Sequence, residues 1–107
     1  MPSACRKTDI QLGTCTQPCN GGGSITQNGE NDKSYSPNVL INTLPASRKT
    51  DKGSTKCPCL GIYEITTGSS NVFVNMLPSV RLSDSTLCDN CSGEGSIMSG
   101  SSNVIIN

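Results

Sequence analysis

A repeated segment is the feature that most constrains how this chain can fold. The stretches "NVLINTLPASRKTD" (residues 38–51) and "NVFVNMLPSVRLSD" (residues 71–84) share Asn-Val-x-x-Asn, Leu-Pro, Arg and Asp at the same offsets. The chain also begins with "MPSACRKTD" and ends with "NVIIN", which supply the two halves of a further copy. A repeat at this spacing predicts that one supersecondary unit recurs three times along the chain.

Starting each unit at its proline divides the single domain of 107 residues into units of about 2–42, 45–75 and 78–107. Each unit contains Arg-x-x-Asp, and an extra residue at or near Cys5 is expected in the first. In each unit a cysteine precedes an isoleucine by six residues: Cys19 and Ile25, Cys59 and Ile65, Cys91 and Ile97. The first unit is longer after its isoleucine, and we expect the excess to form a loop within the polar run 27–35.

Composition favours an all-β fold with a thin core. Apolar residues make up 33% of the chain, there is no Trp, and the eleven Gly and six Pro argue against long helices. The segments with the pattern Asn-Val-x-x-Asn are predicted to be strands, one in each unit, and Leu-Pro ends the first two because proline cannot donate to a ladder. These strands are apolar on both faces, so each is either buried on both or packed against a partner.

Three strand-turn units could close around a pseudo-threefold axis or stack as a short solenoid. A solenoid needs atypical capping repeats at its ends. Here the first unit lacks its preceding strand and the last lacks its Leu-Pro, as in a ring that is cut at one seam. We therefore expect a small pseudo-threefold cone.

Charge and composition exclude several classes of function. Eight acidic and eight basic side chains are scattered and sum to zero, so neither a nucleic acid nor an anionic membrane is indicated as a partner. No stretch resembles a membrane span or a signal peptide, which predicts a chain that is soluble in the cytosol where it is made. The absence of histidine and of serine-nucleophile motifs argues against an enzyme.

The repeat resembles that of the PAAR family, whose members tip the spikes of bacterial contractile injection machines and related phage tails. The matching stretches are Pro45-Ala-Ser-Arg48, Pro78-Ser-Val-Arg81 and, with an insertion, Pro2-Ser-Ala-Cys-Arg6. The family segment "GSSNVFVNGLPAAR" is similar to "GSSNVFVNMLPSVR" at residues 68–81, and "GSSNV" recurs at residues 100–104. The resemblance covers essentially the whole chain. Where the family has glycine after the strand's Asn, this chain has Thr43 and Met76, so we expect less tight turns.

The seven cysteines could form disulfides, hold a metal, or be inert and buried. Cys57 and Cys59 are too close in sequence for an unstrained disulfide, and a cytosolic origin disfavours disulfides in general. Family members hold one zinc near the apex with several histidines and a cysteine. This chain has no histidine, so the family's metal ligands carry over by position only. We expect one structural metal ion, zinc first and iron second, which staples the apex through thiolates. The candidate ligands are Cys19, Cys59 and Cys91 as a ring, Cys57 as the fourth, and Cys88 and Cys15 in reserve; Cys5 is not expected to be one.

The resemblance implies a structural protein that caps and sharpens a trimeric β-helical spike, with one tip chain per trimer, and helps to pierce the target envelope. It would be made in the bacterial cytoplasm and located at the distal tip of the spike. The Arg-x-x-Asp that recurs in each unit is expected to pair and shape a turn rather than to bind a partner. The residues expected to bind the spike are Asn38, Val39, Asn42, Asn71, Val72, Asn75, Asn103, Val104 and Asn107. Two alternatives remain: a small thiolate metal-binding or redox module, and an adaptor that attaches effectors.

Overall fold

The computed structural model describes residues 2–15, 25–55, 62–88 and 94–106. All of the regular elements in these ranges are β-strands, as the composition predicts. No helix in these ranges is long and apolar enough to cross a membrane. The molecule is elongated, with principal extents of 40 × 25 × 21 Å.

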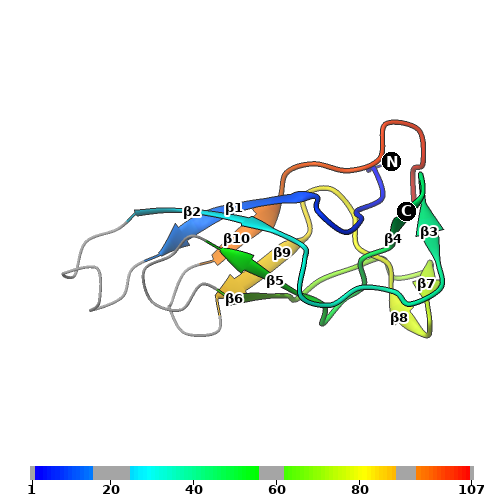
Figure 1. Ribbon diagram of the computed structural model, residues 1–107, viewed down its shortest axis with the longest axis horizontal. Coiled ribbons are helices and arrows are strands. Elements are labelled where there is room, and N and C mark those ends of the chain that lie inside the picture. The colour runs from blue at the N-terminus through cyan, green and yellow to red at the C-terminus, as the bar shows by residue number, and fades with distance from the viewer. Residues whose placement is uncertain (1, 16–24, 56–61, 89–93, 107) are drawn as a thin grey trace.

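Six strands close into an antiparallel barrel in the order β1-β10-β9-β6-β5-β2 (Figure 1). Closure leaves these strands without free edges, so each one pairs on both sides. Each repeat supplies two of the strands, and consecutive repeats meet where β2 pairs with β5, β6 with β9, and β10 with β1. The strands are β1 (Ile10–Cys15), β2 (Ile25–Glu30), β5 (Lys52–Thr55), β6 (Ile62–Ile65), β9 (Ser85–Cys88) and β10 (Glu94–Ile97).

Two short hairpins lie together at one end of the barrel, where both chain ends are also found (Figure 1). One joins β3 (Leu40–Ile41) to β4 (Leu44–Pro45), and the other joins β7 (Phe73–Val74) to β8 (Leu77–Pro78). An isolated bridge between Ser3 and Ile105 supplies a third pairing of the same kind. We call this end of the molecule the hairpin end.

A closed cycle of backbone hydrogen bonds establishes the pseudo-threefold axis. The amide of Cys5 donates to the carbonyl of Val80 at 2.9 Å, Val80 donates to Ser47 at 3.1 Å, and Ser47 donates to Cys5 at 3.1 Å. Each bond links a different pair of repeats, and the third returns to the first residue. A solenoid could not close in this way, so the predicted ring is confirmed.

The extra residue predicted near Cys5 is not present, so this prediction was wrong. Three equivalent pairings fix the alignment: Leu40 with Pro45, Phe73 with Pro78, and Ile105 with Ser3. Ser3 therefore occupies the position of the repeat's proline, and Pro2 takes the place of the preceding leucine. The sequence alignment misplaced Pro2 because it matched proline to proline where the backbone matches serine to proline.

The position assigned to Ile25 was also wrong. The carbonyls of Asn31, Ile65 and Ile97 accept equivalent bonds from Thr8, Thr50 and Ser83, so Asn31 is the counterpart of the two isoleucines. Most of the extra residues of the first unit precede Asn31 and only one lies between Asn31 and Ser36, so the excess is not the predicted loop at 27–35. They lengthen β1 and β2 to six residues each, against four in the other barrel strands.

The prediction of one strand per unit was incomplete. Each unit contributes two barrel strands, whereas the Asn-Val-x-x-Asn segments form strands of only two residues at β3 and β7. The hydrophobic pattern did not reveal the barrel strands, because they are rich in Ser, Thr and Gly and only alternate residues face inward. Gln11 and Thr86 are buried in this way, and Gln11 Nε2 donates to Thr86 Oγ1 at 2.8 Å.

A small core includes the barrel interior and the residues around the axis. Its apolar part consists of Cys5, Tyr63, Ile65, Val80 and Ile97, all fully buried. Tyr63 fills the barrel interior because glycine stands opposite it: a Cβ on Gly53 would meet the Tyr63 ring and hydroxyl and the backbone of Glu30.

Candidate docking face and the network behind it

Each Arg-x-x-Asp motif folds into the same clamped turn. The backbone amide and Nε of Arg48 donate to Asp51 Oδ2 at 2.8 and 2.9 Å, and a terminal guanidinium nitrogen donates to Oδ1 at 2.9 Å. Arg6 with Asp9 and Arg81 with Asp84 repeat this geometry. The hydrogen bond to its Asp raises the pKa of each Arg above its ordinary value. The motif therefore shapes a turn, which supports the structural interpretation of these residues.

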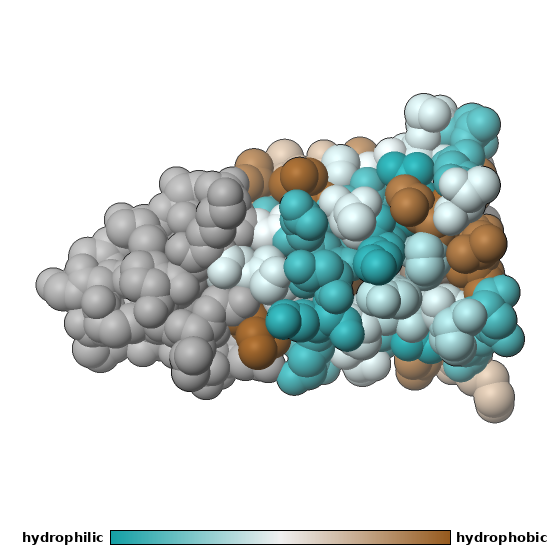
Figure 2. All heavy atoms as spheres, viewed as in Figure 1, coloured by the Kyte–Doolittle hydropathy of each residue, from teal (hydrophilic) through white to brown (hydrophobic). Residues whose placement is uncertain are grey.

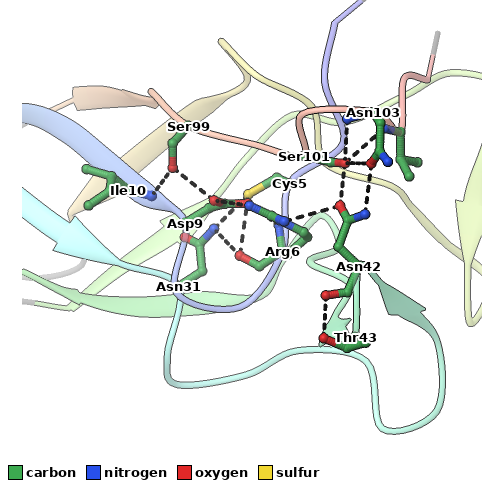
Figure 3. Close-up of polar contacts among 11 residues, drawn as sticks. Cys5, Arg6, Asp9, Ile10, Asn31, Asn42, Thr43, Ser99, Ser101 and Asn103 are labelled. Atoms are coloured by element: carbon green, nitrogen blue, oxygen red, sulfur yellow. Dashed lines mark hydrogen bonds and ion pairs between the residues drawn. The ribbon is translucent and has the colours of Figure 1, made fainter.

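Asparagine side chains tie neighbouring repeats together at the hairpin end (Figure 3). Asn42 Oδ1 accepts hydrogen bonds from Arg6 at 3.2 Å and from the Ser101 hydroxyl, and Asn42 Nδ2 donates to Asn103 Oδ1 at 2.8 Å. Asn75 is bonded in the same way, accepting from Arg48 at 3.4 Å and from Ser36 at 2.6 Å, and donating to Asn38 at 2.8 Å. These two asparagines are the first residues of the hairpin turns, so the network fixes both turns.

Both turns are of type I′, with two consecutive residues at positive φ. The φ angles are 53° and 67° at Asn42 and Thr43, and 51° and 68° at Asn75 and Met76. Type I′ turns suit β-hairpins because their twist matches that of the strands, and they normally carry glycine at the second position. The looser turns expected from the absence of glycine are not formed: Thr43 and Met76 adopt the glycine conformation.

Large apolar side chains are exposed at the hairpin end. Leu40, Phe73 and Ile105 are 60%, 57% and 53% exposed, and they occupy equivalent positions in the three pairings. Met76 beside them is 92% exposed. Figure 2 shows apolar atoms, coloured brown, at this end of the molecule among polar ones, and others along the barrel. We call the surface formed by Leu40, Phe73, Met76 and Ile105 the apolar face; an exposed apolar cluster of this kind is typical of an interaction site.

The residues predicted to bind a partner lie beside this face. Val39, Val72 and Val104 are half-buried, whereas the side of the strand that carries Leu40 and Ile105 is exposed. The asparagines predicted to bind are exposed at Asn38, Asn42, Asn71, Asn75 and Asn103, while Asn107 lies outside the described residues. The sequence pattern indicated Leu40 and Ile105 indirectly. A strand that is apolar on both faces needs a partner to cover the face that its own fold leaves exposed.

Most of the candidate metal ligands lie outside the described residues. Strands β1, β5 and β9 run away from the hairpin end, and β2, β6 and β10 run back toward it (Figure 1). The described strand ends next to the three connections therefore lie at the end of the barrel away from the hairpins. Cys19, Cys57, Cys59 and Cys91 are in these connections, outside the described residues, as is the side chain of Cys15. Cys88, at the end of β9, is buried. No group of three possible metal ligands occurs within the described ranges.

A buried polar chain lies near the axis behind the apolar face. Asn31 Nδ2 donates to Cys5 Sγ at 2.7 Å, and the Tyr63 hydroxyl donates to Asn31 Oδ1. Burial, with a smaller effect of Asp9, raises the pKa of Cys5 from 9.0 to about 12. Burial also raises the pKa of Tyr63. Cys5 is therefore a neutral thiol at physiological pH, and a neutral buried thiol is a poor nucleophile.

Comparison with known proteins agrees with the repeat. A family model described as the PAAR motif matches residues 13–91 and again residues 63–107, so that two overlapping matches extend from the first barrel strand to the end of the chain. No curated protein matches the chain. The family model covers well over half of the sequence, and the chain belongs to the PAAR motif family.

Proposed function

We propose that this protein is the tip of a contractile injection machine and caps the distal end of a trimeric β-helical spike. Proteins with the PAAR motif are structural proteins of injection-system spikes. A trimeric spike ends in three equivalent strand edges, which would be prone to aggregation if they were left open. A single chain with three equivalent pairings can cover all three at once. The opposite end then faces the target envelope.

The observation that carries this proposal is the threefold arrangement of the apolar face. Leu40, Phe73 and Ile105 come from sequence positions far apart, and the internal symmetry places them around one axis. A large apolar residue is retained at the same exposed position in all three repeats, although water would favour a polar one. A partner with threefold symmetry would meet one such side chain on each of its subunits.

We also propose that the end opposite the hairpins holds one structural metal ion, with zinc as the first candidate and iron as the second. Its ligands would be thiolates from among Cys19, Cys57, Cys59, Cys91, Cys88 and Cys15. A thiolate zinc site contributes on the order of 10 kcal/mol to folding. A domain with so small an apolar core would gain much of its stability from such a site. The metal would hold the three connections together where the force of penetration falls.

The docking proposal predicts that Phe73→Lys weakens binding to the spike. The probe is the purified β-helical trimer of the spike protein encoded in the same genome. Burying a lysine charge in an apolar contact should reduce affinity by about tenfold or more, measured by biolayer interferometry. Native mass spectrometry of the parent complex should give one tip chain per trimer.

Leu87→Lys is the matched control for this variant. Leu87 is also a large exposed apolar residue, at 45%, but it lies on the barrel wall in β9. Its replacement should leave affinity unchanged. Three tip chains per trimer, or equal affinity of the parent and the Phe73→Lys protein, would contradict the proposal.

The metal proposal predicts about one zinc ion per chain in the purified protein, measured by elemental analysis. Cys59→Ser should lose the metal and melt at a lower temperature, since removal of one thiolate opens the coordination shell. Cys5→Ser is the control and should not affect metal content, because the buried Cys5 thiol accepts a hydrogen bond from Asn31 near the hairpin end. Metal-free parent protein of unchanged stability would exclude a structural metal.

A further inference from the structure

Met76 combines two features that are unfavourable for the isolated protein. Its side chain is 92% exposed, the most of any large apolar residue in the described ranges. Its backbone is left-handed, with φ at 68°, a conformation in which a Cβ crowds the backbone and glycine is preferred. Glycine would remove both disadvantages at once. The side chain of Met76 therefore does little for the stability of the protein on its own.

The turn holds Met76 in this conformation rather than letting it relax. Asn75, the preceding residue, is bonded to Ser36, Arg48 and Asn38, which come from two other segments of the chain. On either side of the turn, Val74 pairs with Leu77 in the hairpin. With both flanks fixed, Met76 projects from a rigid corner in a defined direction. A rigidly presented side chain loses less conformational entropy on binding than one on a mobile loop.

The equivalent corner formed by Asn42 and Thr43 provides an internal comparison. Thr43 has nearly the same φ, 67°, and Asn42 makes the same set of bonds as Asn75. The two corners thus share a backbone and differ in the exposed side chain, which is polar in one and apolar in the other. A feature needed only for the turn would be common to both corners, so the apolar side chain of Met76 requires a separate explanation.

We propose that Met76 is a contact residue for the spike and enters an apolar recess on the end face of one spike subunit. This inference rests on the proposed function, because the spike is the occupant to which the apolar face is assigned. Met76 lies in the same hairpin as Phe73, so its contact continues the surface that carries the threefold apolar positions. Methionine is flexible and polarizable, which suits it to filling an irregular recess. The corner with Met76 then binds more strongly than the corner with Thr43.

The test measures stability and affinity on the same set of variants. Met76→Gly should melt at or above the temperature of the parent, because glycine relieves the left-handed strain, yet bind the spike trimer about tenfold more weakly. Met76→Gln should melt like the parent and also bind weakly, whereas Met76→Leu should bind like the parent. Thr43→Gly is the matched control: it relieves the same strain and should bind like the parent.

Phe73→Lys separates failure of this inference from failure of the proposed function. If Phe73→Lys binds weakly while Met76→Gly and Met76→Gln bind like the parent, Met76 is not a contact and the inference is overturned. If all three variants bind like the parent, the docking proposal itself fails. If the tip alone forms a dimer that Met76→Gln dissociates, measured by analytical ultracentrifugation, the occupant is a second copy of the chain and the inference is again overturned.

Discussion

Among single residues, Cys5 is one whose ionisation the fold controls strongly. Its thiol has a pKa of 9.0 when unperturbed and about 12 in the folded protein. The unfolded chain therefore releases this proton at a lower pH than the folded protein does. The stabilising contribution is fully present below pH 9.0 and is lost as the pH rises toward about 12. Within that window we expect the free energy of unfolding to fall by about 1.4 kcal/mol per pH unit because of this group.

Urea unfolding at several pH values between about 7 and 11 measures this dependence. Cys5→Ser is the informative variant, because Ser47 occupies the equivalent position in the second repeat and a hydroxyl does not ionise in this range. The variant should show a shallower fall in stability above pH 9.0. The Tyr63 hydroxyl, whose pKa is also raised, contributes at higher pH, and Tyr63→Phe removes its share. Parallel profiles for the parent and Cys5→Ser would show that Cys5 has no such role.

The role of Arg48 and Asp51 could be predicted from the sequence, but the buried chain of Cys5, Asn31 and Tyr63 could not. An Arg and an Asp at a constant short spacing in every repeat favour a local pair, which the structure confirms. The buried chain joins residues from three separate segments, and the equivalent residues of the other repeats cannot form it. It depends on Asn31 taking the place of an isoleucine, and a repeat alignment that matches like with like overlooks such an exchange.

At the scale of elements, the sequence indicated strands and turns but not which segments form the barrel. The hydrophobic pattern drew attention to the residues around β3 and β7, where apolar side chains cluster. The barrel strands instead bury polar residues such as Gln11 and Thr86 inside a narrow interior, so their pattern is weak. Pairing between distant strands supplies their stability, and that pairing is determined by closure of the whole ring rather than by local propensity.

The barrel hairpin of the first repeat is longer than those of the other two, and this too could not be located from the sequence. The pairing of β1 with β2 covers six residue pairs, from Ile10 with Glu30 to Cys15 with Ile25. In the other two repeats the corresponding hairpins pair over three residues each. Because Asn31 remains at its equivalent position, the additional length extends the hairpin of β1 and β2 away from the hairpin end without disturbing the axis. The sequence showed the additional length, but its location required the register.

At the scale of the whole molecule, the internal symmetry makes the chain a ring whose seam lies in one hairpin. Ile41 pairs with Leu44 and Val74 pairs with Leu77, each across a two-residue turn. At the equivalent place the amide of Ile106 donates to the carbonyl of Pro2 at 3.0 Å. If the chain were closed into a ring, only Asn107 and Met1 would lie between Ile106 and Pro2. A peptide bond from Asn107 to Met1 would therefore give a two-residue connection, the same length as the two existing turns.

This geometry predicts that a circular permutant folds. The permutant joins Asn107 directly to Met1 and opens the chain between Asn42 and Thr43, at the equivalent turn. Because every pairing of the barrel and the cycle through Cys5, Ser47 and Val80 is retained, its circular dichroism spectrum and metal content should match those of the parent. Its melting temperature should fall only modestly, since one fixed turn is exchanged for another.

A second permutant opened within β6, between Tyr63 and Glu64, is the control and should not fold, because it interrupts a barrel strand that pairs on both sides. If both permutants were equally stable, continuity of the barrel strands would not be what holds the repeats together; if neither folded, the seam would not be equivalent to the other two turns.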